Sequence, residues 1–113
     1  MTYRFRANRM LKINMEYRKG ILFVRPCGNL TRVTYKCLND YLLPVIGNQG
    51  IKYIVYNLGN VRVIDNKGKE SLLEGINAVR KNLGEGIICN TCIKFENALV
   101  TEDELSAIKL IKI

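Results

Sequence analysis

The sequence predicts an α/β fold in which one mixed sheet of four to five strands is covered by helices. The first observation is the short, β-branched and aromatic run at residues 51–58, which is typical of a buried strand. The second is the stretch after it, in which apolar residues recur at helical spacing up to Leu83. The third is another apolar strand at residues 86–89. Strand, helix and strand in so few residues form a βαβ unit, and its crossover makes the two strands parallel.

Two further strands precede this unit. Leu11, Ile13 and Met15 alternate with polar residues over residues 11–17, which is the period of a half-buried strand. A turn then leads into an apolar strand over residues 20–27, and two strands this close predict a β-hairpin. Residues 1–9 are polar and basic and are interpreted as an N-terminal extension, so the domain proper spans residues 10–113.

A helix is predicted from about Val33 onward, because apolar residues again recur at helical spacing. Thr31 or Asn29 is expected to cap its first turn by accepting a hydrogen bond from a free backbone N–H. Pro44 either kinks this helix or ends it at the preceding residue. Residues 47–50 contain two glycines and are expected to terminate it.

The pattern weakens after the second strand of the βαβ unit. Residues 95–100 form either a short strand or a loop. Thr101 and Glu104 have the spacing of a capping box, in which each side chain bonds the other residue's backbone N–H. A final helix is predicted over residues 102–111, with Leu105, Ile108 and Ile111 on its buried face.

Composition limits the possible functions. The chain has 113 residues, enough for one domain, and a formal net charge of +8, which suggests an acidic partner. Only Arg4, Arg6, Arg9 and Lys12 approach a cluster of positive charge, so a nucleic-acid-binding role is kept as an alternative. The apolar runs are shorter than the ~20 residues of a membrane helix. The N-terminus lacks a signal peptide's apolar segment, so we expect a cytoplasmic protein.

The residues that carry catalytic or metal chemistry are few. The chain has no histidine, which removes the commonest general base and metal ligand, and no nucleophile–base pair is found. Cys27, Cys37, Cys89 and Cys92 are expected to be thiols in a cytosolic protein, with Cys89 buried and Cys92 more exposed. A redox role for the Cys89–Cys92 pair, or a zinc site with all four cysteines, is a minor alternative. We therefore expect no enzyme, no metal and no cofactor.

Three sequence segments resemble the STAS domain, the fold of anti-anti-sigma factors and of sulfate-transporter tails. Residues 20–31 resemble the family's opening strand, which ends in Gly-Glu-Leu-Asp. Residues 54–58, Ile-Val-Tyr-Asn-Leu, resemble its central strand. Residues 63–68, Val-Ile-Asp-Asn-Lys-Gly, resemble the signature Phe-Ile-Asp-Ser-Ser-Gly, and a small residue and leucines follow it. The family normally has a helix after the strand that ends at Cys89. This chain has too few residues there, so a shortened C-terminal region is expected.

The resemblance implies a non-enzymatic regulator that binds an anti-sigma factor or a related kinase-fold protein. The implied partner-binding residues lie in the loop before the first helix and at the start of the second: Asn29, Thr31, Arg32, Thr34, Asp65, Asn66, Lys67, Gly68 and Ser71. Asp65 is expected to cap the second helix, and Gly68 to allow another surface to approach closely. Sensing of a small anion such as a nucleotide at the same helix N-terminus is an alternative function.

The resemblance also identifies a departure at the family's phosphorylation site. The phosphorylated serine of the family precedes the signature glycine, and that position is Lys67 here. Lysine cannot accept a phosphate at a hydroxyl, so the serine switch is expected to be lost. Ser71 is the nearest hydroxyl, but it lies one turn further along the helix.

Overall fold

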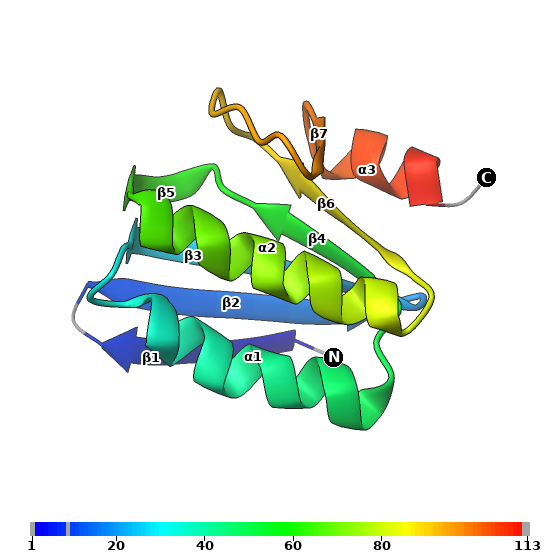
Figure 1. Ribbon diagram of the computed structural model, residues 1–113, viewed down its shortest axis with the longest axis horizontal. Coiled ribbons are helices and arrows are strands. Elements are labelled where there is room, and N and C mark those ends of the chain that lie inside the picture. Colours follow the sequence, from blue (N-terminus) through cyan, green and yellow to red (C-terminus); the bar gives the residue numbers. More distant parts are fainter. Residues whose placement is uncertain (1, 9, 112–113) are drawn as a thin grey trace.

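The computed structural model describes the backbone of residues 2–8 and all of residues 10–111. The chain begins with three strands, and helices then alternate with pairs of strands (Figure 1). The elements in chain order are β1 Thr2–Asn8, β2 Leu11–Arg18, β3 Ile21–Leu30, α1 Tyr35–Gln49, β4 Tyr53–Asn57, β5 Asn60–Ile64, α2 Asn66–Lys81, β6 Glu85–Cys89, β7 Leu99–Thr101 and α3 Glu104–Ile111.

The strands form one mixed sheet, which confirms the predicted fold class. Its order is β1-β2-β3-β4-β6-β7, and β5 pairs with the end of β3 beside β4. The β1–β2 and β2–β3 pairs are antiparallel, and the remaining pairs are parallel. β4 and β6 are joined through α2, as the predicted βαβ unit requires.

The described residues contain seven strands, which is more than the four to five predicted. β1 lies in the segment interpreted as an extension and pairs with β2 along its length. β5 falls in a stretch where no strand was expected. β7 decides between the two alternatives for residues 95–100: Leu99 and Val100 belong to a short edge strand, and a loop precedes it.

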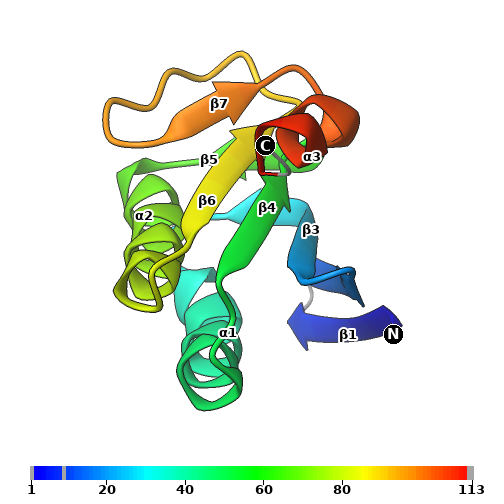
Figure 2. The same cartoon turned by 90° about the vertical axis from the view of Figure 1, so that its right-hand side faces the viewer.

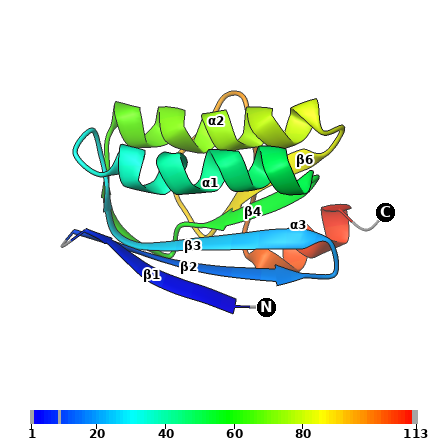
Figure 3. The same ribbon diagram turned by 90° about the horizontal axis from the view of Figure 1, so that it is seen from below.

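Helices cover the two faces of the sheet unequally. α1 and α2 lie side by side on one face, and the shorter α3 lies on the other (Figure 2, Figure 3). The larger core fills the space under α1 and α2, where Leu38 and Leu42 of α1 and Leu72 and Ile76 of α2 are fully buried. A smaller cluster under α3 contains Phe23, Val55 and Ala107. No helix in the described part of the chain is long and apolar enough to span a membrane.

The start of α1 differs from the prediction, although its extent agrees. α1 continues through Pro44, so the helix does not end there. Its N-cap residue is Thr34, whose side chain makes no capping hydrogen bond, and not Thr31 or Asn29 as predicted. The Thr31 hydroxyl does accept a hydrogen bond from the N–H of Val33 at 3.2 Å, but in the turn before the helix. Val33 precedes the helix and is 60% exposed, so it is not part of the buried face. Gly50, in the left-handed region at φ 63°, ends the helix as expected.

The predicted capping box of α3 is also wrong. The helix begins at Glu104, and Asp103 Oδ1 accepts a hydrogen bond from the N–H of Ser106 at 2.8 Å. The Thr101 hydroxyl instead donates to the carbonyl of Asp103. Leu105, expected on the buried face, is 60% exposed, whereas Ala107 is fully buried.

Candidate functional site

Asp65 organises the turn between β5 and α2. Its Oδ1 accepts a hydrogen bond from the N–H of Gly68 at 2.9 Å, which caps α2 as predicted. Its Oδ2 accepts a second bond from the N–H of Arg32 at 2.9 Å. These two hydrogen bonds hold the pKa of the Asp65 carboxyl below its ordinary value, because both favour the ionised form. The bond from Arg32 has the larger effect, and the bond from Gly68 the next largest. One carboxylate therefore joins the two loops that the sequence assigns to partner binding.

The buried side chain of Thr34 holds the loop between β3 and α1 through two hydrogen bonds to its backbone. The Thr34 hydroxyl accepts a hydrogen bond from the N–H of Thr31 at 2.9 Å and donates to the carbonyl of Asn29 at 2.7 Å. Thr34 is fully buried, so the prediction that it contacts a partner is not supported by its position. Its side chain fixes the loop that presents Arg32 to solvent.

Gly68 is buried at the first turn of α2, and its role differs from the expectation. A Cβ at this position would collide with the backbone oxygen of Leu30 and lie 2.9 Å from Cγ1 of Ile64. The close approach that glycine allows is therefore made by β3 and β5 of the same chain, and not by a partner. α2 can start against the sheet only because residue 68 has no side chain.

Ser71 is fully buried in the interface between α1 and α2. Its hydroxyl donates to the carbonyl of Gly68 at 2.6 Å, and its own carbonyl accepts a hydrogen bond from Nδ2 of Asn39 at 3.3 Å. Neither a partner nor a kinase can reach this hydroxyl in the packed helix. Ser71 is therefore corrected from a candidate contact to a packing residue.

Lys67 is exposed at the N-terminus of α2 and contacts two neighbours. Its Nζ lies 3.3 Å from Oε2 of Glu70 and 5.5 Å from the ring centroid of Tyr35, the first residue of α1. The hydrogen bond to Glu70 is the main reason why the pKa of Lys67 is raised. The ammonium group thus lies above the junction of the two helix starts, at the position where the family resemblance places a phosphorylated serine.

Six of the nine candidate residues remain accessible and form one surface, here called the turn surface. Three are exposed and three are half-buried: Arg32, Asn66 and Lys67, and Asn29, Thr31 and Asp65. They come from the two loops that Asp65 joins. The turn surface carries two cations and one anion, and that anion is already engaged by two backbone N–H groups.

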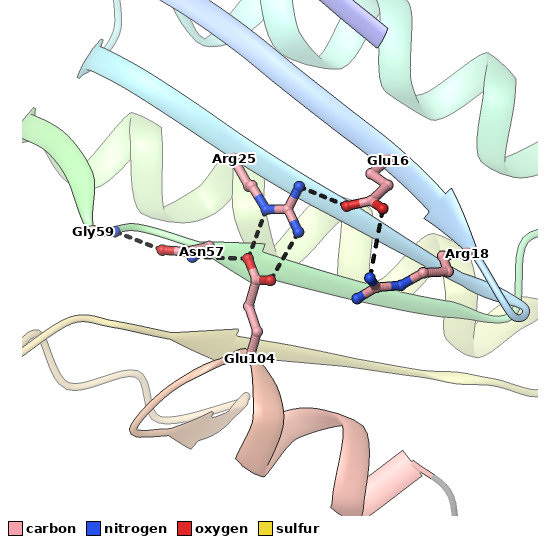
Figure 4. A network of polar contacts seen from close by, with 6 residues as sticks. All are labelled: Glu16, Arg18, Arg25, Asn57, Gly59 and Glu104. Atoms are coloured by element: carbon pink, nitrogen blue, oxygen red, sulfur yellow. Dashed lines mark hydrogen bonds and ion pairs between the residues drawn. The ribbon is translucent and has the colours of Figure 1, made fainter. Parts of the chain in front are cut away.

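A second polar network, not predicted from the sequence, lies on the opposite face of the sheet (Figure 4). Arg25 of β3 makes a two-pronged ion pair with Glu104 of α3, at 2.7 Å and 2.8 Å. Glu16 also pairs with Arg25, at 3.0 Å, and Asn57 donates to Glu104 at 2.8 Å. The network attaches α3 to the sheet. The alternating strand pattern placed Glu16 on this face, but nothing local marks Arg25 and Glu104 as partners.

The cysteines show no shared site. Cys89 is buried and Cys92 is exposed, as predicted, and none of the four forms a disulfide. Burial raises the pKa of the Cys89 thiol to about 12, which opposes the thiolate that redox chemistry needs. Among the described residues, no three metal-ligating side chains lie together.

Comparison with known proteins agrees with this geometry. The family model described as "STAS domain" matches residues 12–99. The anti-sigma F factor antagonist of Paenibacillus polymyxa is 28% identical over 80 residues, which are 71% of this chain and 68% of that protein.

Two solved structures show the same fold at low sequence identity. An anti-sigma factor antagonist from Mycobacterium paratuberculosis superposes with a TM-score of 0.75, at 13% identity over 91% of this chain and 95% of that one. The Bacillus cell fate determinant SpoIIAA, in its phosphorylated form, superposes with a TM-score of 0.73, at 15% identity over 88% and 99%.

Proposed function

This chain belongs to the STAS domain family, and we propose that it is an anti-sigma factor antagonist: a non-enzymatic cytoplasmic regulator that binds an anti-sigma factor or a related kinase-fold protein. The turn surface is the proposed contact. The observation that carries the proposal is the double hydrogen bond of Asp65, which ties the loop before α1 to the start of α2. A surface fixed in this way loses little conformational entropy when a partner binds.

We further propose that the chain has no phosphorylation switch at this surface. Two observations support this. The exposed position before Gly68 is Lys67, which has no hydroxyl. The nearest hydroxyl on the helix, that of Ser71, is buried and engaged with the carbonyl of Gly68. The proposed antagonist therefore stays competent to bind whenever it is present.

The experiment that tests the function is a binding titration with an anti-sigma factor of the same cell. We expect heat of binding in calorimetry, and the same affinity after the two proteins are incubated with ATP. Intact-mass spectrometry of the incubated chain should show no added phosphate. Lack of binding to every anti-sigma factor of the cell would refute the function. A phosphate on this chain that abolishes binding would refute only the absence of a switch.

A further inference from the structure

The face of the sheet opposite α1 and α2 contains a basic hollow of about 360 Å³ near the end of β3. Lys12 of β2 and Arg62 of β5 line it from the two strands that flank β3, with Cys27, Gly28 and Asn29 between them. The site is not the turn surface, because its two cations lie on strands and on the other face. Asn29 alone belongs to both.

The two cations have no carboxylate of their own. Neither Lys12 nor Arg62 forms an ion pair with any residue that the structure describes. Two acids on this face, Glu16 and Glu104, are already paired with Arg25. Residues 1–9 contain arginines and no acid, and the register of β1 places Arg6 opposite Lys12. Among the described residues, no ion pair therefore neutralises the two cations of the hollow.

The backbone that lines the hollow is held in place by a hydrogen bond and by the conformation of a glycine. The N–H of Asn29 donates to the carbonyl of Met10 at 2.8 Å, which fixes the β1–β2 turn against β3. Gly28 has φ 118°, and a Cβ there would collide with the same carbonyl. The shape thus depends on glycine at this position, and the hollow is formed before any ligand arrives.

We infer that this hollow binds an acidic segment of a partner protein through two of its carboxylates. Lys12 and Arg62 are on strands separated by β3, so their backbones are about 10 Å apart. Two cations on separate strands can each pair with one carboxylate of an extended peptide, whose alternate side chains lie about 7 Å apart. No described residue that lines the hollow is aromatic, so it lacks the stacking platform of a nucleic-acid site. The choice of a protein as occupant rests on the proposed function, since Asn29 makes the hollow continuous with the turn surface.

The test is titration of the full chain with a hexaglutamate peptide, followed by NMR of the backbone amides. We expect the peptide to shift the amides of Gly28, Asn29 and Arg62, and to bind more tightly than inorganic phosphate or a short single-stranded oligonucleotide. The double variant Lys12→Gln/Arg62→Gln should weaken binding at least about fivefold. Lys52→Gln removes an exposed lysine at the other end of the sheet and should leave affinity unchanged.

Each other outcome overturns the inference. An equal loss in Lys52→Gln would show attraction by net charge only, and tighter binding of the oligonucleotide or of phosphate would assign another ligand class. Absence of shifts at Gly28 and Asn29 would place the peptide elsewhere. Because the probe is a peptide, the result does not depend on finding the anti-sigma factor: a chain that binds hexaglutamate here but no anti-sigma factor keeps this site and loses the proposed function.

Discussion

The N–H of Arg32 donates a hydrogen bond to the carboxylate of Asp65 at 2.9 Å, across 33 residues of sequence. The same carboxylate caps α2 through Gly68. Asp65→Ala removes both bonds, so we expect a lower melting temperature and greater mobility of the loop before α1. Asp65→Asn keeps one amide oxygen as an acceptor and should show a smaller effect. Thermal unfolding at neutral pH, with backbone dynamics by NMR, measures both changes.

The pH dependence of this contribution has a definite sign. The hydrogen bonds from Arg32 and Gly68 lower the pKa of Asp65 in the folded state. The stabilisation is therefore complete above the ordinary carboxyl pKa of about 3.9 and is lost as the pH falls through the lower, folded value. The difference in melting temperature between the wild type and Asp65→Ala should be largest near neutral pH and shrink below about pH 4. A difference that grows in acid would contradict the assigned bonds.

Substitutions at Lys67 test whether the turn surface is the partner contact. Lys67→Glu reverses the charge above the start of α2, where the family resemblance places a phosphate, and should weaken binding of the anti-sigma factor. Lys67→Ser removes the charge without reversing it and should have a mild effect. Lys81→Glu is the matched control, because Lys81 is an exposed lysine at the far end of the same helix. Calorimetry of the four proteins that shows equal affinities would exclude the turn surface as the contact.

Gly75 of α2 lies so close to Tyr56 of β4 that substitutions at the two residues should have coupled effects on stability. A Cβ at Gly75 would collide with the Tyr56 hydroxyl, which is buried and has no hydrogen-bond partner among the described residues. We expect Gly75→Ala to lower the free energy of unfolding by about 1–3 kcal/mol despite the better helix propensity of alanine. Tyr56→Phe deletes the unpaired hydroxyl and should change stability by less than about 1 kcal/mol.

The double variant Gly75→Ala/Tyr56→Phe decides whether the hydroxyl is the cause. It should cost less than the sum of the single changes, because removal of the hydroxyl makes room for the new methyl group. Chemical denaturation of the four proteins gives the coupling energy. If the two changes in the free energy of unfolding simply add, the new methyl group clashes with atoms other than the Tyr56 hydroxyl.

These small residues show what the sequence did and did not reveal. The apolar period placed α2 correctly over most of its length, because Leu72, Ile76 and Val79 dominate its buried stripe. Its predicted end was wrong: α2 stops at Lys81, and Leu83 is 88% exposed. Gly68, Ser71 and Gly75 lie on the same stripe at spacings of three and four, and that regularity could have predicted their burial. The motif resemblance drew attention to their order along the chain instead, so Gly68 and Ser71 were assigned to a partner that they cannot reach.

Other errors have a non-local cause. The capping box was wrong because α3 begins only at Glu104, where Asp103 bonds the N–H of Ser106. The carboxylate of Glu104 instead binds Arg25, 79 residues away, and no local pattern contains that partner. β5 was missed because all five of its residues are exposed or half-buried, and its strand pairing is with the end of β3. Local periodicity predicts elements that bury a continuous stripe, and it fails for elements that depend on pairing.

The ion pair between Arg25 and Glu104 should stabilise α3 specifically. Both side chains are mostly buried and the pair is two-pronged, so Glu104→Gln should cost about 1–2 kcal/mol. The hydrogen bond from Arg25 is the main cause that lowers the pKa of Glu104, so this stability is present above the ordinary glutamate pKa and is lost in acid. Hydrogen exchange should quicken at the Ala107 N–H, which bonds Asp103 in α3, and remain unchanged in α1. Uniform quickening would mean that the network does not act locally.

The thiols should react in an order set by burial. Cys92 is exposed, whereas Cys89 is fully buried and has its pKa raised to about 12, mainly by burial and further by the nearby charge of Glu104. At pH ~8 the Cys89 thiol is therefore almost entirely protonated, and it is shielded from solvent. An aromatic disulfide reagent should label Cys92 in the folded protein long before it labels Cys89. Peptide mapping by mass spectrometry at increasing times measures the order. In denaturant all four cysteines should react, without release of stoichiometric zinc. Simultaneous labelling of Cys89 and Cys92, or fewer than four thiols, would instead support a paired or metal-bound site.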